Sequence, residues 1–296
     1  MLPGMPEQRS VKQTPKPRVA IVGAGNLAGA LAVALRGAGY TIDEVVSRGR
    51  AVSLQRARRL ASEVNAAAVT LAQARLRAGV VWFCVPDGAI LAAAKSLGET
   101  TDWRGKVAVH SSGALTSDEL TDLRQRGAAI ASVHPLMTFV RGSRPQMVGV
   151  PFAIEGDAAA VRMVRRIVKD LCGYAYPILK KDKAAYHAWG TFASPLLTAL
   201  LVTSEHVASV AGVKPKAARQ RMLPMIRQTL ANYAVFGGAG AFSGPIVRGD
   251  VQTIGKHLSV LRGTPEARDI YLALARAALR DLPGKKRRAL KKVLKR

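Results

Sequence analysis

A short apolar run near the N-terminus leads into a glycine-rich turn and then into a helical pattern: Val19-Ala20-Ile21-Val22-Gly23-Ala24-Gly25-Asn26-Leu27-Ala28-Gly29. Gly23 permits the tight turn, Gly25 lets the backbone approach a pyrophosphate, and Ala28 lets the helix pack closely on the strand. The amides at the helix N-terminus favour an anion. A G-x-G-x-x-A string alone is a weak signal and also fits an ordinary strand–helix turn, but strand, turn and helix in this order predict a dinucleotide-binding loop. The residues expected to bind the cofactor there are Gly23, Ala24, Gly25, Asn26, Leu27 and Ala28.

Outside this loop, short apolar runs alternate with helical patterns as far as about residue 150. The runs lie at 18–22, 42–47, 67–71, 80–85, 106–110 and 128–133. This alternation predicts a mostly parallel sheet covered by helices on both faces. Ile154 and residues 176–179 are expected to extend the sheet around a helix at 157–171.

Strand signals end at about residue 181, and helical patterns cover 182–211, 215–236, 250–261 and 265–282. The run of glycine and alanine at 237–240 separates the second helix from the third. The predicted fold class is an α/β Rossmann-like N-terminal domain followed by an all-α C-terminal domain. The expected divisions are a disordered leader at 1–17, the dinucleotide-binding domain at 18–180, a helical substrate or dimerisation domain at 181–282, and a basic tail at 283–296.

The composition excludes several classes of protein. The chain has 296 residues and is 49% hydrophobic, which is too apolar for a disordered protein. Cys84 and Cys172 are too few for a disulfide framework and indicate a reducing compartment. The most apolar stretch, 189–202, is too short to cross a bilayer, and residues 1–17 lack the apolar run of a signal peptide. We therefore expect a cytoplasmic protein with no membrane association.

The formal charge of +26 raises the question of nucleic-acid binding. Its densest part is the tail 283–296, with eight basic residues and no acidic residue, which predicts a solvated or loosely helical end. No nucleic-acid motif accompanies the charge, and aromatic residues for base stacking make up only 5% of the chain. Nucleic acid is thus an unlikely partner. No spacing of metal ligands is present, so no metal is expected.

The end of the second predicted strand bears on the choice of cofactor. Ser47 and Arg48, followed by Arg50, suit a 2′-phosphate, which favours NADP(H) over NAD(H). A count of about 20 residues from the loop reaches Asp43 and Glu44 instead. Those two residues are expected near the start of the strand, away from the ribose. The alternative for the two arginines is plain exposed loop charge.

The exit of another buried strand, Val85-Pro86-Asp87, lies at the edge where open α/β sheets bind ligands. Val85 and Pro86 are expected to wall the nicotinamide side. Asp87 is a cofactor contact or the cap of the next helix. Cys84 is expected to be an inert core residue.

Two histidine segments follow predicted strands and are expected to contact substrate: His110-Ser111-Ser112-Gly113 and His134. A strand-end histidine also occurs as a purely structural residue. Further along, Lys183 and His187 lie four residues apart on one helical face, where either is able to protonate an atom that gains charge during hydride addition. The alternative is an exposed pair at a helix start.

The helical half adds a loop at 242–250. Arg248 is expected to clamp a carboxylate through two hydrogen bonds. Asp250 is expected either to orient Arg248 or to cap the following helix.

Together these segments give the chain a family resemblance. It resembles the bacterial proteins that join a Rossmann-like domain to a helical domain of unknown function (2520), which are regarded as NADP oxidoreductases. The matching segments are 23–27, 85–87, 110–115, 134–139, 183–187 and 243–250. More distantly it is similar to pyrroline-5-carboxylate reductase and the β-hydroxyacid dehydrogenases. The resemblance implies a C-terminal domain like that of 6-phosphogluconate dehydrogenase and a homodimer formed through it.

The chain departs from the family pattern at two places. Ser243 stands where Thr is common, which keeps a hydroxyl. Ser194-Pro195 stands where Ser-Asn is common, which removes an amide side chain and a backbone donor and favours a kink. The expected function is hydride transfer between NADP(H) and a small carboxylate-bearing carbonyl or imine, for example a 2-keto acid such as ketopantoate. The alternative, favoured by Pro195, is a non-catalytic NADP-binding regulator or scaffold.

Overall fold

A computed structural model describes residues 15–295 of the chain. Most of the predicted leader, residues 1–14, lies outside the described residues. Of the remainder, Lys16 contacts the first domain, because its Nζ donates to Ala38 O and pairs with Asp170. The chain divides into one compact unit ending at Gly190 and another beginning at Thr191, rather than at residue 180.

The N-terminal unit is built on one eight-stranded sheet in the order β3-β2-β1-β4-β5-β6-β7-β8. The strands are β1 (Val19–Val22), β2 (Ile42–Ser47), β3 (Ala67–Thr70), β4 (Val80–Phe83), β5 (Val107–His110), β6 (Ala129–Pro135), β7 (Pro151–Gly156) and β8 (Tyr174–Pro177). β1 to β6 pair in parallel, β7 is antiparallel to β6, and β8 is parallel to β7. The predicted, mostly parallel Rossmann-like sheet is therefore confirmed.

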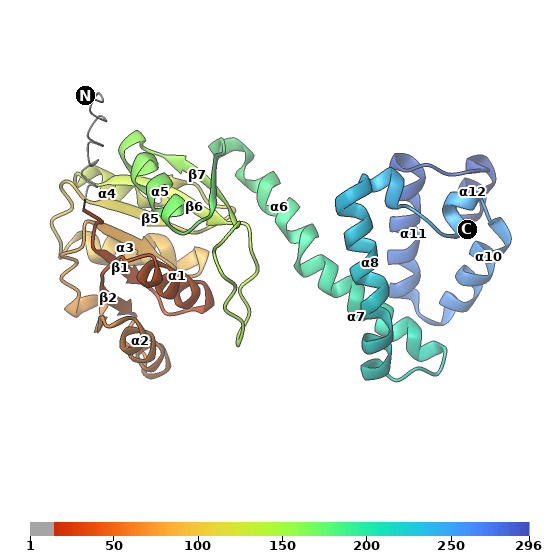
Figure 1. Ribbon diagram of the computed structural model, residues 1–296, viewed down its shortest axis with the longest axis horizontal. Coiled ribbons are helices and arrows are strands. Elements are labelled where there is room, and N and C mark those ends of the chain that lie inside the picture. The colour runs from red at the N-terminus through yellow and green to blue at the C-terminus, as the bar shows by residue number, and fades with distance from the viewer. Residues whose placement is uncertain (1–14, 296) are drawn as a thin grey trace, which may run out of the picture. The chain divides into compact units, whose positions relative to one another are not determined.

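Helices cover both faces of this sheet (Figure 1). They are α1 (Asn26–Gly37), α2 (Ala51–Val64), α3 (Ile90–Gly98), α4 (Thr121–Gln125) and α5 (Ala158–Asp170), with short 3-10 helices η1 (Leu71–Gln73), η2 (Asp87–Ala89), η3 (Ser117–Leu120) and η4 (Lys180–Asp182). One hydrophobic cluster joins α1, α2 and α5 to the sheet, and a second joins α3 and α4 to its other face. Because both faces are buried, β1, β4 and β5 are apolar almost throughout.

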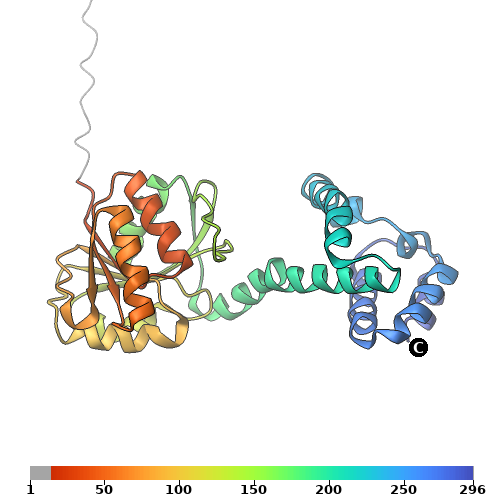
Figure 2. The same cartoon turned by 90° about the horizontal axis from the view of Figure 1, so that it is seen from below.

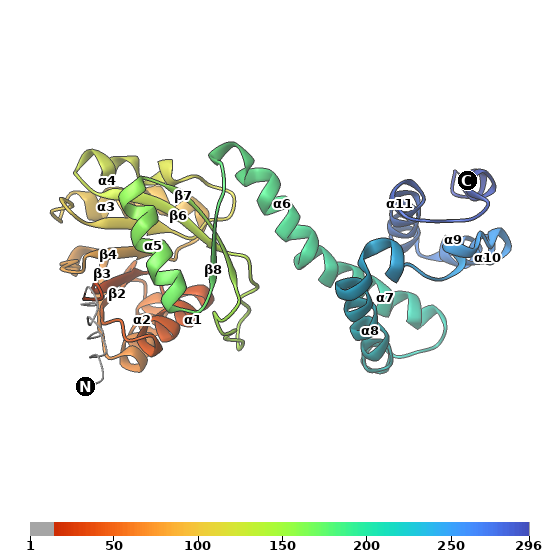
Figure 3. The same ribbon diagram turned by 45° about the horizontal axis from the view of Figure 1, so that its top comes forward.

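The rest of the described chain is helical (Figure 3). The elements are α6 (Lys183–Ala193), α7 (Pro195–Val210), α8 (Pro215–Ala241), α9 (Pro245–Arg248), α10 (Val251–Val260), η5 (Leu261–Gly263), α11 (Pro265–Asp281) and α12 (Arg287–Val293). The single helix predicted at 182–211 is two helices, because Pro195 lacks the amide hydrogen needed to continue the first. The predicted break near 237–240 is a kink within α8 at Gly237, whose φ is 65°.

None of the helices in residues 15–295 is by itself long and apolar enough to cross a bilayer. The bent pair 180–210 and 215–248 meets the length and composition criterion only when taken together.

The basic tail is helical, one of the two forms expected from sequence, but it also packs on its own domain, which was not expected. Leu290 and Leu294 of the tail are 0% and 1% exposed and join the apolar cluster of α10 and α11. The guanidinium group of Arg276 donates to the carbonyl oxygen of Leu294. Two leucines four residues apart form one apolar face among the charges, so the segment folds as α12 and packs on its own domain.

This packing predicts a stability effect for Leu290→Ala. Loss of a fully buried leucine is expected to lower the free energy of unfolding by about 2–5 kcal/mol. Lys291→Ala, on the exposed side of the same helix, is the matched control and is expected to change it by less than about 0.5 kcal/mol. Urea unfolding followed by circular dichroism at 222 nm measures both; equal midpoints for the two variants would contradict the docking of α12.

Candidate functional site

The glycine-rich turn between β1 and α1 lies close to the backbone of Cys84, the residue after β4. Gly23 has φ +111°, and a Cβ at this position would lie 2.4 Å from the carbonyl oxygen of Cys84. A side chain is therefore excluded there. Gly25 is different, because nothing lies within 4 Å of the position its Cβ would take. Ala28 is fully buried against the sheet, as close helix–strand packing requires.

A cavity of about 530 Å³ opens beside this turn, at the carboxyl ends of β1, β2 and β4. The strand order reverses between β1 and β4, which is where sheets of this type bind nucleotides. The structure brings together there these predicted cofactor residues: Gly23, Ala24, Gly25, Ser47, Arg48, Arg50, Val85 and Pro86.

Two further polar residues of this cavity were not predicted from the sequence. Ser53 and Arg56 extend into it from the first turns of α2, on the same side as Arg50. The three-residue spacing of positions 50, 53 and 56 is the signal that identifies them, because it places them on one face of a helix.

Four predicted cofactor residues lie outside this cavity: the buried Ala28, and Asp87, Asn26 and Leu27. The carboxylate of Asp87 accepts a hydrogen bond from Ser112 Oγ at 2.8 Å. The amide of Asn26 donates to Phe139 O at 3.1 Å, and Leu27 packs against the core. These side chains hold the loops around the cavity together.

The two acidic residues of β2, Asp43 and Glu44, make contacts within the protein. Asp43 pairs with Arg18, and Glu44 accepts hydrogen bonds from the backbone amides of Arg75 and Leu76 at 3.2 and 3.0 Å. Both carboxylates therefore lie apart from the end of β2, as the length of that strand had indicated.

Lys183, at the start of α6, is a buried lysine with 1% exposure. Its Nζ donates to Ser132 Oγ at 2.6 Å and to Ser112 O at 3.0 Å. Burial lowers the pKa of this ammonium to about 8, although the nearby carboxylates of Glu155 and Asp87 act to raise it. An exposed lysine at a helix start is thus excluded, and the group titrates close to neutral pH.

His110 does not fulfil the predicted role of a substrate contact. Its ring is 0% exposed, its Nδ1 accepts from the Ser112 amide at 3.1 Å, and its Nε2 donates to Thr116 O at 2.8 Å. Burial lowers the pKa of His110 to about 4. Since both ring nitrogens are engaged within the protein, the neutral ring fixes the shape of the turn that follows β5.

That turn meets two other histidines at Gly113. A Cβ on Gly113 would lie 2.9 Å from His134 Nε2 and 2.6 Å from His187 Cδ2, so only glycine allows both rings to approach. His134 Nδ1 lies 2.9 Å from Tyr186 OH, and burial followed by the charges of Lys183 and His187 lowers the pKa of His134 to about 4. The segments after β5 and β6 and the start of α6 therefore converge.

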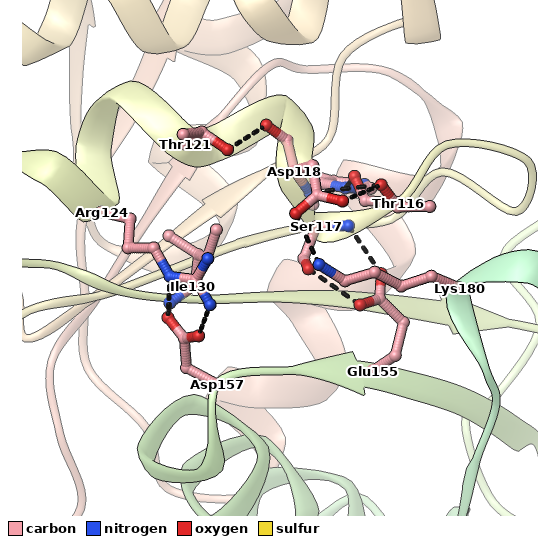
Figure 4. Close-up of polar contacts among 10 residues, drawn as sticks. Thr116, Ser117, Asp118, Thr121, Arg124, Ile130, Glu155, Asp157 and Lys180 are labelled. Atoms are coloured by element: carbon pink, nitrogen blue, oxygen red, sulfur yellow. Dashed lines mark hydrogen bonds and ion pairs between the residues drawn. The ribbon is translucent and has the colours of Figure 1, made fainter.

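A polar network lies around η3, the 3-10 helix that follows this turn (Figure 4). The buried carboxylate of Glu155 on β7 accepts from the amide and hydroxyl of Ser117 at 2.6 and 2.8 Å. Asp118 of the same 3-10 helix pairs with Lys180, three residues before the buried lysine. The network thus ties η3 to both β7 and the segment that leads into α6.

The remaining predicted residues belong to the helical unit. Asp250 caps α10, because its carboxylate accepts from Thr253 N at 3.0 Å and from Thr253 Oγ1 at 2.7 Å. Arg248 is exposed at the end of α9, and its role as a carboxylate ligand stays a prediction.

Two other chemistries find little support in the described residues. Burial raises the pKa of the Cys84 thiol to about 12, which leaves it unreactive, as expected of a core residue. Among residues 15–295, no three side chains of His, Cys, Asp or Glu are grouped so as to hold a metal ion.

Comparison with known proteins agrees with this architecture. The family of Rossmann-like domains matches residues 4–135, and the family described as domain of unknown function 2520 matches residues 150–278. The chain thus joins a Rossmann-like region to a region that matches the family of unknown function. A search of curated proteins finds no match.

Solved structures of several proteins share the fold. A protein from Bacteroides fragilis assigned as an NADP oxidoreductase is 23% identical, with a TM-score of 0.75 over 88% of this chain and 97% of that one. A protein from Thermotoga maritima is 23% identical, with a TM-score of 0.69 over 94% and 98% of the two chains. An imine reductase from Myxococcus stipitatus in complex with NADP+ is 16% identical, with a TM-score of 0.61 over 95% and 100%.

The burial of His110 predicts a loss of stability in acid. Its pKa is about 4 in the folded protein, against 6.5 for an ordinary solvated histidine, so the unfolded chain binds the extra proton between these values. Stability therefore falls as pH falls through this window. Between pH 7 and pH 5 this histidine is expected to remove about 2 kcal/mol, with His134 acting in the same direction.

Urea unfolding at pH 7 and pH 5 tests this effect. His110→Gln is expected to reduce the loss of stability between the two pH values, whatever its effect at pH 7. His206→Gln, at an exposed position of α7, is expected to leave the loss unchanged. The same pH dependence in wild type and His110→Gln would rule out the proposed contribution.

Proposed function

We propose that this protein is an NADP(H)-dependent oxidoreductase that transfers hydride to or from a small carboxylate-bearing carbonyl or imine. The observation that carries the proposal is a buried, titratable lysine at the same sheet edge as a nucleotide cavity. Lys183 contacts Ser112 after β5 and Ser132 on β6, and the cavity lies at the ends of β1, β2 and β4. Some structural neighbours are named as imine reductases and one as an NADP oxidoreductase, which supports the same chemistry.

The preference for NADP(H) rests on the charge of the cavity. Arg48, Arg50 and Arg56 line it together with Ser47, and no carboxylate lines it among the described residues. A 2′-phosphate would find hydroxyl and guanidinium donors there, whereas a free ribose would find no acidic acceptor.

The bound nicotinamide would supply or accept the hydride. Lys183 would supply a proton to the oxygen or nitrogen that gains negative charge. Its Nζ uses two hydrogen bonds to Ser132 and Ser112, which leaves one N–H of the ammonium to donate. The turn at Ser111 and Gly113 and the ring of His134 would border the substrate.

A non-catalytic NADP-binding regulator is the second candidate. Pro195 favours it, because proline ends α6 at the place where the family pattern carries an asparagine side chain. This candidate keeps the cofactor cavity but predicts no turnover.

Lys183→Met separates the two candidates. We expect wild type to bind NADPH and to turn over members of a panel of 2-keto acids and cyclic imines. The variant is expected to lose about 100-fold or more in kcat, because it lacks the proton donor, while its Kd for NADPH changes less than twofold. In the direction of reduction, kcat of wild type is expected to fall as pH rises above about 8, where the ammonium deprotonates.

Lys181→Met, at an exposed neighbouring position, is the control and is expected to behave as wild type. NADPH binding without turnover across the panel would favour the regulator. No binding of NADPH or NADH at millimolar concentration would overturn both candidates.

We also propose that the chain forms a homodimer through its helical unit. α8 is 27 residues long, and Ala218 is its only buried residue among those described. Large apolar side chains along it are exposed: Leu223, Met225, Leu230, Tyr233, Val235 and Phe236. An apolar surface of this extent is typical of an interface between subunits.

Light scattering coupled to size-exclusion chromatography measures the assembly. Wild type is expected to have twice the mass of one chain, and the double variant Leu230→Glu with Tyr233→Glu the mass of a single chain, because two charges would be buried at the interface. Gln228→Glu, exposed on the same helix, is expected to stay dimeric. A monomeric wild type would refute the dimer.

A further inference from the structure

A second cavity lies on the other side of the phosphate-binding turn. Its volume is about 940 Å³, and it shares Ala24, Gly25 and Arg56 with the cofactor cavity. The other walls come from the start of α1, from α2, and from the loop between β6 and β7. Four arginines line it, at positions 56, 59, 141 and 144, against one carboxylate, Glu63.

The loop that forms the outer wall, residues 136–149, is anchored at several points. Phe139 packs against the core, and Met147 is 2% exposed. Asn26 at the start of α1 donates to the backbone of this loop, and Arg144 pairs with Glu63 of α2. Figure 2 shows the loop, in yellow-green, beside α1. This ion pair neutralises the charge of Arg144 and attaches the loop to α2.

Between these anchors the loop presents Arg141 on a tight turn. Ser143 N donates to Val140 O at 3.1 Å, and Gly142 takes φ +82°, which favours glycine at the third position. Arg141 occupies the second position. Its guanidinium group, like those of Arg56 and Arg59, has no ion-pair or hydrogen-bond partner among residues 15–295. Three cations with open donors therefore face the start of α1.

We infer that Arg141 and Arg59 form the outer half of the pyrophosphate site, which closes on the cofactor opposite the amides of α1. The inference rests on the proposed function, since it assigns these arginines to the same dinucleotide. A pyrophosphate seated on the turn at Ala24 and Gly25 would receive amide donors from one side only. Guanidinium groups bind such oxygens bidentately from the other side.

The two cavities divide the phosphates of the cofactor between different arginines. Arg48 and Arg50 line only the first cavity, beside Ser47, and belong to the 2′-phosphate. Arg59 and Arg141 line only the second and belong to the pyrophosphate, which NADPH and NADH share. Arg56 lines both cavities.

Binding of three probes to variants of the full chain tests this division. Arg141→Gln is expected to weaken NADPH and NADH equally, by about tenfold, because it removes one charge-assisted contact to the pyrophosphate. It is expected to leave the binding of adenosine 2′-monophosphate unchanged, since that probe has no pyrophosphate. Arg48→Gln is expected to weaken NADPH and adenosine 2′-monophosphate but not NADH.

Arg58→Gln is the matched control, because this arginine is exposed on α2 but does not line either cavity; its affinities should equal those of wild type. Thermal unfolding verifies that each variant is folded. If wild type binds NADPH and Arg141→Gln binds it equally well, the pyrophosphate assignment is overturned and the proposed function stands. A loss of affinity for NADPH alone would also overturn the assignment, because it would indicate that Arg141 contacts the 2′-phosphate. A wild type that binds neither dinucleotide would overturn the proposed function and the assignment together.

Discussion

The arrangement of the N-terminal domain depends on one backbone contact, between Gly23 and the carbonyl of Cys84. A Cβ at Gly23 would lie 2.4 Å from that oxygen, so the exits of β1 and β4 are able to run side by side only because a hydrogen replaces the side chain. This approach sets the start of α1 at the point where the strand order reverses. The cofactor cavity, the turn that borders it and the arginine-lined cavity beyond that turn all take their positions from it.

A second constraint is the burial of Lys183. An ammonium group in the interior is costly unless its donors are satisfied, and here two of them are taken by Ser132 and by the backbone of Ser112. The lysine therefore attaches α6 to the turn after β5 and to the middle of β6. Since the same ammonium is the proposed proton donor, the hydrogen bonds that hold the helix also place this donor at the edge of the sheet.

The parts of the structure that follow local rules were predictable from sequence. The alternation of apolar runs with helical patterns predicted the strands, because burial on both faces leaves a local trace in each strand. The glycine-rich turn was predictable for the same reason, as its steric role depends on consecutive residues. Asp43 and Glu44 were correctly placed away from the end of β2 because the length of that strand is visible in the chain.

The remaining features depend on contacts between distant segments. Nothing local distinguishes the buried Lys183 from the exposed Lys181, or shows that both nitrogens of His110 are occupied by Ser112 and Thr116. The docking of α12 was missed because its many basic residues obscured two leucines at helical spacing.

The distribution of charge is more informative than its total. A net charge of +26 is compatible with many anionic partners and selects none of them. The arginines around the glycine-rich turn restrict the ligand more than the total charge does. Among the described residues, no carboxylate lines the cavity that holds Arg48, Arg50 and Arg56. Glu63, the one carboxylate that lines the second cavity in the described part of the chain, is paired with Arg144. Arginines without a partner in the described residues line two adjoining cavities, and a ligand with two separate phosphate groups would pair with both sets. A dinucleotide with a pyrophosphate and a 2′-phosphate has two such groups, so the position of the charge, rather than its magnitude, is what supports the proposed preference for NADP(H).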